Sequence, residues 1–303
     1  MLPGGSFSRS SALQRSVLLA TLSVVGVQCV AAVGSISSSL RIADLTRKIP
    51  SRPFHALTGS QFAELISTLD PHAREQATLD EVLRGNLPAF LRRLVPVELT
   101  YREPHGASLT ATIFVTADYL AIGTDTDFFR IPLNLHSALA IANRFGFLLP
   151  TTKVVDAIYE ESHFHFMPQP LPAGPRMTSP EYFWLHNQIV EQQSRARGFS
   201  PGTLVSGHKK DLVITNRLAA RPGQLAIYGW HRGSGEPIQS LSTVHGAGYA
   251  DYSHGVRLVS QKAIMDGRVR SVYDILRDPL LARVLSDEGA IRSVETVAAT
   301  ESR

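Results

Sequence analysis

The segment from Gly207 to Val259 restricts the possible folds more than any other part of the chain. It contains short apolar and β-branched runs, and glycine or proline separates each run from the next. Such runs are too short and too often interrupted for long helices, but they are typical of short strands connected by tight turns. We therefore expect a small sheet here, with strands at Leu212–Thr215, Gln224–Tyr228 and Val256–Val259.

The rest of the chain contains both helical and strand patterns. Capping residues and apolar spacing predict helices that begin after Thr58, lie within Leu79–Leu94, and cover Asn134–Phe147, Thr151–Glu161, Ser179–Arg197 and Ser271–Leu276. Gly85 and Pro88 should divide the second of these into two short helices. Val97–Tyr101 and Ala107–Val115 predict a β-hairpin. Together these patterns predict an α+β fold, with a mostly antiparallel sheet and packed helices.

The N-terminal residues have the pattern of a segment that directs export. Arg9 and Arg15 precede an uncharged run from Ser16 to Val33, and Ala32-Val33-Gly34 has the small-residue form of a cleavage site. This pattern predicts a secretory signal peptide, with a single uncleaved N-terminal membrane anchor as the alternative. Both interpretations place the rest of the protein outside the cytoplasm, where it is periplasmic, secreted or anchored facing outside.

Proline content divides the remaining chain into two parts. Five prolines fall between Pro168 and Pro180, which is typical of a linker. The expected organisation is a signal peptide or anchor at 1–34, a polar spacer at 35–57, an N-terminal α+β part at 58–167, a Pro-rich linker at 168–180, a site-bearing α+β part at 181–290 and a polar tail at 291–303.

Composition and charge exclude several classes of protein. The 303 residues are 44% hydrophobic and 18% charged, as in an ordinary globular protein. The net charge is +4 without a basic stripe interleaved with aromatic residues, so nucleic acid is not an expected partner. A mild positive charge suits a cell-wall polymer or another anionic envelope ligand.

Cysteine content limits the chemistry further. Cys29 is the only cysteine, and it lies in the N-terminal apolar run. The folded part therefore has no disulfide framework, no cysteine nucleophile and no thiolate-bound metal. Any metal site must use His, Asp and Glu side chains.

Ionisable residues concentrate in the segment that constrains the fold. Four of the eleven histidines lie there, beside two aspartates and many glycines. Convergent ionisable groups on a backbone that permits close approach are typical of catalytic and metal sites. We assign candidate catalytic roles to His208, Asp211, His231 and Tyr252. Candidate substrate-binding roles fall to Lys209, Lys210, Trp230 and Arg257.

A short motif in this segment resembles a known family. Ser242–Asp251 reads Ser-Thr-Val-His-Gly-Ala-Gly-Tyr-Ala-Asp and resembles the Ser-x-His-x-x-Gly-x-Ala-x-Asp signature of zinc peptidases that cut peptidoglycan cross-links, the D-Ala-D-Ala carboxypeptidase and endopeptidase group. The Ser-to-His spacing is one residue longer here, and the His-to-Asp spacing is one residue shorter. The resemblance implies that His245 and Asp251 bind zinc and that His254 completes the ligand set.

The resemblance also implies a reaction. Zinc lowers the pKa of a bound water toward about 7, which makes hydroxide available at neutral pH. The expected function is therefore an exported cell-envelope hydrolase that acts on peptidoglycan or a related polymer.

Other interpretations of the same residues stay open. A metal-free enzyme would use His245 or His208 as general base, with Asp251 or Asp211 as its carboxylate partner. Glycan cleavage would need two carboxylates, from Asp211 with Asp251 or Glu236. A non-catalytic periplasmic binding or envelope-assembly protein would hold an anionic ligand with Lys209, Lys210 and Arg257. In a purely structural interpretation, these polar residues would only satisfy buried hydrogen bonds in a glycine-rich sheet.

Overall fold

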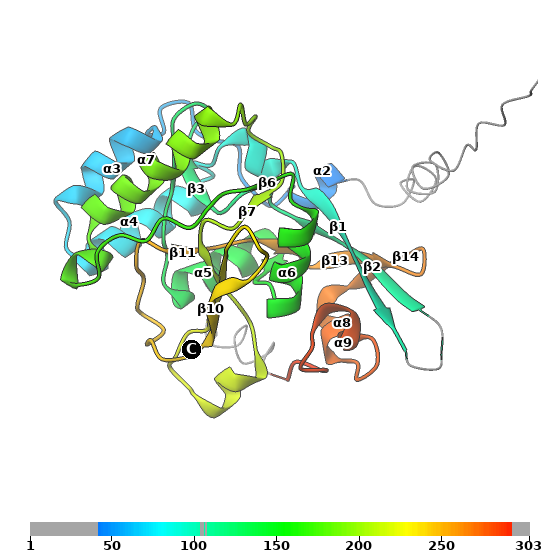
Figure 1. Ribbon diagram of the computed structural model, residues 1–303. Helices are drawn as coiled ribbons and strands as arrows, with labels where there is room; N and C mark the ends of the chain where they lie inside the picture. Colours follow the sequence, from blue (N-terminus) through cyan, green and yellow to red (C-terminus); the bar gives the residue numbers. More distant parts are fainter. Residues whose placement is uncertain (1–41, 104–105, 107, 293–303) are drawn as a thin grey trace, which may run out of the picture. The chain divides into compact units, whose positions relative to one another are not determined.

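Antiparallel strands form most of the sheet structure in the computed structural model, which describes residues 42–103, 106 and 108–292 (Figure 1). Over these ranges the largest sheet has six strands, and its strand β2 pairs with three neighbours. Val95 lies opposite Val115 and Arg102 opposite Ser108, which confirms the predicted hairpin. The strands are β1 (Val95–Arg102), β2 (Ser108–Val115), β5 (Phe147–Leu148), β12 (Val259–Ser260), β13 (Lys262–Met265) and β14 (Arg268–Ser271).

A second sheet carries the segment with the candidate site residues. Its strand order is β10-β9-β8-β11, and β8 and β11 run parallel, with His254 opposite Lys210. The strands are β8 (Lys210–Leu212), β9 (Ile227–His231), β10 (Pro237–Ser242) and β11 (His254–Gly255). A Cβ on Gly255 would lie 2.6 Å from the Tyr119 ring and 2.8 Å from the Lys209 side chain. Only glycine therefore allows β11 to approach β8 this closely.

Some strand boundaries differ from the expectation. The strand predicted at Leu212–Thr215 begins earlier, at Lys210, and β9 begins later, at Ile227. Of the strand predicted at Val256–Val259, only Val259 lies in a strand. It belongs to β12, which pairs with β2 and β5 of the larger sheet. Two further strand pairs are short: β3 (Ala121–Gly123) with β4 (Phe128–Arg130), and β6 (Phe164–His165) with β7 (Val205–Ser206).

Helices surround the sheets and begin at the residues that cap them. Thr58, Asn134, Thr151 and Ser179 each accept a hydrogen bond from a backbone amide of the helix that follows. The α-helices are α2 (Ile42–Leu45), α3 (Gly59–Ser67), α4 (Pro71–Leu83), α5 (Leu135–Phe145), α6 (Thr152–Glu161), α7 (Pro180–Ala196), α8 (Val272–Arg277) and α9 (Ala282–Leu285). The 3-10 helices are η1 (Ala89–Arg92), η2 (Pro175–Thr178) and η3 (Asn216–Ala220).

One helix prediction needs correction. The helix expected within Leu79–Leu94 begins earlier, at Pro71, because Asp70 accepts hydrogen bonds from the amides of His72 and Ala73. Proline fits the first turn, where its missing amide hydrogen costs nothing. After Gly85 and Pro88 the chain forms only the 3-10 helix η1, so the predicted break is confirmed and the second helix is shorter than expected.

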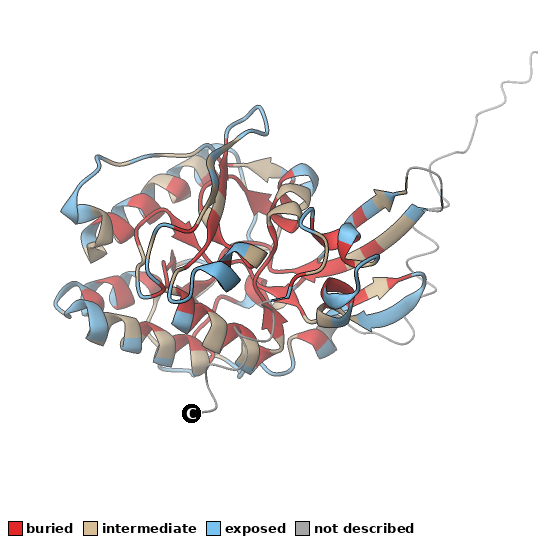
Figure 2. Ribbon diagram, turned by 90° about the horizontal axis from the view of Figure 1, so that it is seen from below, coloured by how far each residue is buried: buried red, intermediate tan, exposed pale blue. Residues whose placement is uncertain are grey.

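Apolar residues from both halves of the chain share one core. Phe62 and Ile113 lie in the same buried cluster as Leu212 and Val259. Figure 2 shows buried residues in the strands and on the inner sides of the helices. Contacts group Leu40–Arg303 into one unit. The Pro-rich segment therefore connects two parts that fold around a common core.

The predicted export signal falls outside the described residues. Residues 1–34 and the polar tail beyond residue 292 belong to the ranges for which the structure gives no description. Within the described ranges, no helix has the length and apolar character needed to span a bilayer.

A buried ionic network ties the site segment to the core. Arg130 at the end of β4 donates from Nε to Asp118 Oδ2 over 2.8 Å and from Nη1 to Glu191 of α7 over 2.6 Å. His208, which precedes β8, lies 3.1 Å from Asp118 Oδ1. Asp118 and Arg130 are each 1% exposed. The network thus joins the β2–β3 loop, β4, α7 and the entrance to β8.

Removal of Arg130 should destabilise the protein strongly. Arg130→Met leaves the Asp118 carboxylate buried without its cation, which should lower the free energy of unfolding by about 3–5 kcal/mol. Urea unfolding followed by tryptophan fluorescence measures this change. Arg176→Met is the matched control, because it removes the exposed Arg176–Glu181 pair and should cost at most about 1 kcal/mol. Equal losses for the two variants would contradict the assignment.

Candidate functional site

The structure brings the three residues implied as metal ligands into one neighbourhood. His245, Asp251 and His254 are joined there by Tyr249, which the sequence analysis did not select, and these four residues are called the motif cluster. The His245 ring stacks on the Tyr249 ring with centroids 4.2 Å apart, and the His245 and His254 centroids are 6.4 Å apart.

Asp251 lies at the centre of the motif cluster. Its Oδ1 accepts hydrogen bonds from the Ser253 amide over 2.8 Å and from the Ser253 hydroxyl over 2.6 Å. Its Oδ2 accepts one from the Tyr249 hydroxyl over 3.1 Å. Burial would raise the pKa of Asp251, but His254 and these hydrogen bonds hold it below its usual value. The carboxylate is therefore ionised at neutral pH.

Tyr249 connects this carboxylate to the surface. Its ring is half-buried, as is His245, whereas Asp251 is only 1% exposed. Burial and the neighbouring Asp251 raise the pKa of Tyr249 to about 12. The phenol thus stays protonated and keeps donating to Asp251.

His254 is buried without hydrogen-bond partners. Neither ring nitrogen has one among the described residues, and Nε2 lies 3.6 Å from Asp251 Oδ2. Burial lowers the pKa of His254 to about 4, with Asp251 opposing the shift. The ring is therefore neutral at pH 7, which is the form that binds a metal.

The motif cluster is more open than a closed zinc site. Two imidazoles on one tetrahedral zinc, each with a Zn–N bond of about 2 Å, would have centroids roughly 5 Å apart, against 6.4 Å here. Within the described ranges, no group of three or more His, Cys, Asp or Glu side chains is arranged to hold a metal ion. Zinc binding stays a prediction that would require the loop to close by about 1 Å.

Lys210 and Trp230 lie together on neighbouring strands. The Lys210 ammonium is 5.0 Å from the centroid of the Trp230 ring, a cation–π distance. Burial lowers the pKa of Lys210, and Asp251 opposes that shift. Trp230 has a positive φ of 58°, which costs energy for a bulky residue and indicates a backbone held by its surroundings. Of the four candidate substrate-binding residues, only Lys210 is not fully buried.

The other candidate cations are buried beneath the motif cluster. Lys209 is 1% exposed, and its ammonium donates to the Tyr252 carbonyl over 2.5 Å. Burial lowers the pKa of Lys209 to about 7. Arg257 is fully buried and donates to the carbonyls of Thr116 and Val205. Both side chains therefore stabilise the interior rather than a surface ligand.

His208 and Asp211 also lie in the interior. His208 contacts Asp118, and burial lowers the pKa of His208 to about 4. Asp211 accepts a hydrogen bond from the Tyr119 hydroxyl over 2.8 Å. Burial raises the pKa of Asp211 to about 6, against the lowering effect of Arg257. Neither group is exposed, so each acts on the site only through its neighbours.

His231 and Tyr252 have partners of their own. His231 Nε2 lies 2.9 Å from Asp156 Oδ1, and its ring stacks on Tyr159. The Tyr252 hydroxyl accepts a hydrogen bond from the Leu171 amide over 2.8 Å. These contacts fix α6 and the Pro-rich segment to the sheet, and they do not involve the motif cluster.

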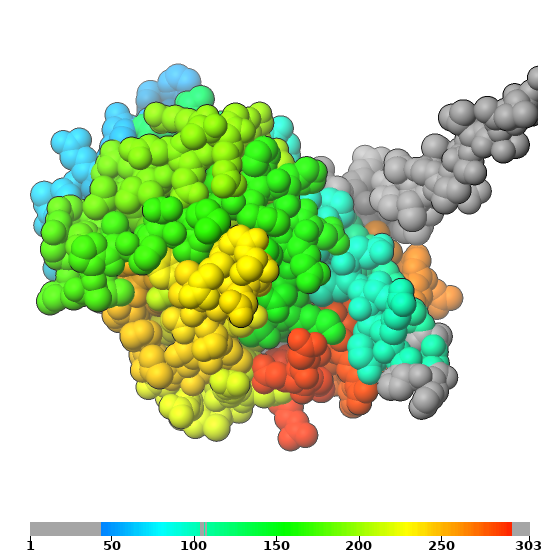
Figure 3. Space-filling view, in the orientation of Figure 1, coloured from blue at the N-terminus to red at the C-terminus, as the bar shows by residue number. Residues whose placement is uncertain are grey.

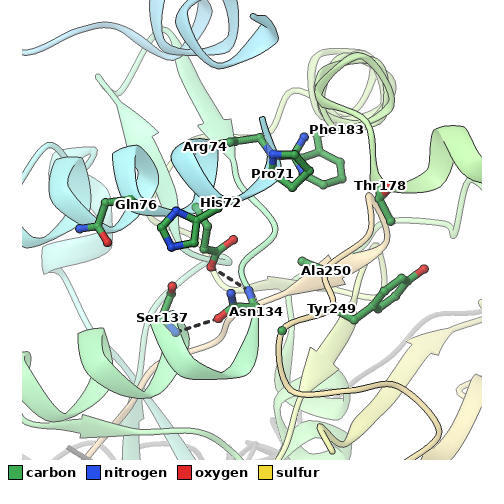
Figure 4. A pocket seen from close by; sticks show the side chains of 12 residues that line it. Pro71, His72, Arg74, Gln76, Asn134, Ser137, Thr178, Phe183, Tyr249 and Ala250 are labelled. Atoms are coloured by element: carbon green, nitrogen blue, oxygen red, sulfur yellow. Dashed lines mark hydrogen bonds between the residues drawn. The ribbon is translucent and has the colours of Figure 1, made fainter. Parts of the chain in front are cut away.

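A pocket of about 520 Å³ opens beside the motif cluster (Figure 4). Gly248, Tyr249 and Ala250 form one side of it, and residues of α4 and α5 form the other. The full lining is Pro71, His72, Arg74, Glu75, Gln76, Asn134, Ser137, Thr178, Phe183, Gly248, Tyr249 and Ala250.

Glu75 is the carboxyl group of this pocket, and sequence reasoning missed it. Its Oε1 accepts a hydrogen bond from the Asn134 amide over 3.0 Å, the contact dashed in Figure 4. Burial raises the pKa of Glu75, with Ser137 and Asn134 opposing. Its spacing on α4 resembles that of any helical glutamate. Only the tertiary fold places it opposite the motif loop.

Comparisons of the chain with protein-family models, with curated proteins and with solved structures gave no match. The site's own geometry therefore carries the functional argument.

Acid should destabilise the protein, because two buried histidines that are neutral in the folded state become protonated on unfolding. His208 and His254 have a pKa of about 4 when folded, against about 6.5 when unfolded. Unfolding therefore takes up protons as the pH falls from about 6.5 to about 4, and each histidine lowers the free energy of unfolding by up to roughly 1.4 kcal/mol per pH unit. Asp211 has the opposite effect, because its pKa is raised to about 6 in the folded state. It therefore offsets the loss of stability caused by about one of the two histidines.

Urea unfolding at several pH values between 7 and about 4 tests this balance. We expect stability to fall across this range, and the fall to be shallower in His254→Gln, which keeps the size and neutrality of the ring. Stability that rises toward pH 4 would show that the histidines are not held neutral.

Proposed function

We propose that the protein is an exported hydrolase that cleaves peptidoglycan or a related envelope polymer in the pocket beside Tyr249. The observation that supports this most is the meeting of two segments far apart in sequence. The motif loop, Gly248 to Ala250, and Glu75 line the same pocket. Acid–base hydrolysis needs two ionisable groups on different sides of the bond that is cut.

Glu75 acts as the general acid in this proposal. Burial raises its pKa, so its protonated form persists to higher pH than in an exposed glutamate. A carboxylic acid whose pKa is raised by burial can donate a proton to a leaving group. The hydrogen bonds of Glu75 with the Asn134 backbone amide and with Ser137 hold its carboxyl group at the wall of the pocket.

His245 acts as the general base. It is the half-buried histidine of the motif cluster, whereas His254 is fully buried, and its stacking on Tyr249, which lines the pocket, fixes the plane of its ring. Asp251 is a positioning residue, because it accepts the Tyr249 hydroxyl and so orients the ring on which His245 lies. Proton transfer by such a base contributes about 10²–10⁴-fold to a rate.

Arg74 supplies a binding site for an anionic group of the substrate. Its guanidinium lies 5.1 Å from the Phe183 ring centroid, at the wall of the pocket. It forms no salt bridge within the described part of the chain. Peptide stems of an envelope polymer carry carboxylates, and a guanidinium can bind a carboxylate through two hydrogen bonds.

The non-catalytic alternative has less support. It relied on Lys209, Lys210 and Arg257, of which Lys209 and Arg257 are buried against backbone carbonyls. It stays a prediction, and no contact in the described residues favours it over hydrolysis.

Glu75→Gln should remove activity without removing the fold. Glutamine can still accept the hydrogen bond from Asn134 but cannot donate an acid proton, so the rate should fall by about 10²–10⁴-fold. The alkaline limb of the pH–rate profile should disappear as well. Release of soluble fragments from purified sacculi measures both effects. Asp80→Asn, an exposed carboxylate of the same helix outside the pocket, is the control and should retain full activity.

His245→Ala should abolish most of the release of soluble fragments from sacculi. Chelation with EDTA then distinguishes acid–base catalysis from zinc catalysis. Activity that survives EDTA supports acid–base catalysis by His245. Activity that EDTA removes and zinc restores supports the zinc prediction, provided that about one zinc per chain is lost in His254→Ala. An undiminished rate in His245→Ala would refute a catalytic role for the motif cluster.

A further inference from the structure

Two hollows meet at Trp184 on α7, away from the motif cluster. One, of about 520 Å³, lies between α3 and the start of α7, and the other, of about 340 Å³, lies between α7 and the turn before β4. Ser60 and Trp184 line both, so we treat the hollows as one feature, the α7 groove. Its polar lining includes Ser60, Glu64, Ser67, Asp127, Glu181, Gln188, Glu191, Gln192 and Arg195.

The α7 groove is long and follows one side of a helix. Trp184, Gln188, Gln192 and Arg195 are spaced by four, four and three residues, so they share one face of α7. From Pro180 to Arg195 the helix rises about 22 Å at 1.5 Å per residue. Figure 1 shows α3 and α7 side by side, and Figure 3 shows α7 at the surface. This shape suits an extended chain better than a small metabolite.

Three polar side chains of the α7 groove are free to bind. Gln188, Gln192 and Arg195 are exposed and have no hydrogen bond to any described residue. An amide both donates and accepts hydrogen bonds, as a sugar hydroxyl does. Trp184 is half-buried and held edge-on against Phe129 with centroids 5.3 Å apart. It offers a rigid aromatic surface for the apolar face of a sugar ring.

Charge restricts the class of polymer. Carboxylates of Glu64, Asp127, Glu181 and Glu191 surround the α7 groove, whereas Arg195 is the cation in its lining. Arg130 and Arg176, outside the lining, pair with Glu191 and Glu181. Glu64 and Asp127 form no salt bridge with a cation of the described residues. An anionic polymer would meet this excess of negative charge, and a neutral chain would not.

We propose that the α7 groove binds a neutral glycan chain, with Trp184 stacking on a sugar ring and Gln188 and Gln192 bonding its hydroxyls. Phe183 lines the pocket beside Tyr249, and the next residue, Trp184, lines the α7 groove. Consecutive helical residues face different sides, so the α7 groove and the pocket are separate binding surfaces. The binding does not depend on whether the pocket hydrolyses anything.

Calorimetric titration of the full chain with a soluble chitin hexamer, a neutral glycan, tests the proposal. The double variant Gln188→Ala/Gln192→Ala changes only exposed side chains and should weaken binding by about tenfold or more, since two hydrogen-bonding groups are lost. Trp184→Ala should weaken it at least as much, and Trp184→Phe should keep part of the affinity. Leu185→Ala is the control, because Leu185 is an exposed neighbour outside the α7 groove and should bind as the wild type does.

Three results would overturn the proposal: no saturable binding of the hexamer by the wild type, tighter binding of the anionic polymer heparin than of the hexamer, or unchanged affinity in the glutamine double variant. Because the readout is binding, an inactive pocket leaves the test intact. A protein that binds the hexamer and cleaves nothing refutes the proposed hydrolysis alone.

Discussion

The buried carboxylate of Asp118 holds together the elements on which the site depends. It accepts hydrogen bonds from Arg130 and lies against His208, so β4 and the entrance to β8 are fixed to the same group. Burial alone would raise the pKa of Asp118, but Arg130 and His208 hold it well below its usual range. A buried charge is tolerated only where partners satisfy it, so the position of β8 follows from this network.

The motif cluster depends on β8 in turn. β11 pairs in parallel with β8, and Gly255 permits the close approach of Tyr119 and Lys209. Asp251, three residues before His254, then lies under the loop that carries His245 and Tyr249. The ionised Asp251 carboxylate thus contacts the protonated Tyr249 hydroxyl, and the Tyr249 ring contacts His245 beside the pocket.

Local signals in the sequence predicted the secondary structure well. The hairpin, the capped starts at Thr58 and Asn134, and the α+β class depend on neighbours in sequence, which can be read directly. The start of α4 precedes the apolar spacing that predicts the helix, because the Asp70 cap and Pro71 begin it in a mostly polar stretch. Strands β13 and β14 were missed because each is only four residues long and gains strand structure by pairing, β13 with β2 and with β14.

The site was predictable only where its residues are close in sequence. His245, Asp251 and His254 come together because a short glycine-containing loop connects them. Lys209 and Arg257 resembled surface cations, and their burial depends on carbonyls and carboxylates contributed by distant segments. Glu75 and Tyr249 gave no local signal, since their environment exists only after α4, α5 and the motif loop have packed.

The most direct test of the account is the mass of the products from purified sacculi incubated with the full chain in water enriched in heavy oxygen. The account predicts that each cut places one heavy oxygen on one of the two newly formed ends, so that labelled ends appear in the digested material, and that Glu75→Gln forms none. Sacculi that stay intact, or digested material in which no new end carries heavy oxygen, would contradict hydrolysis at the pocket between Glu75 and the motif loop.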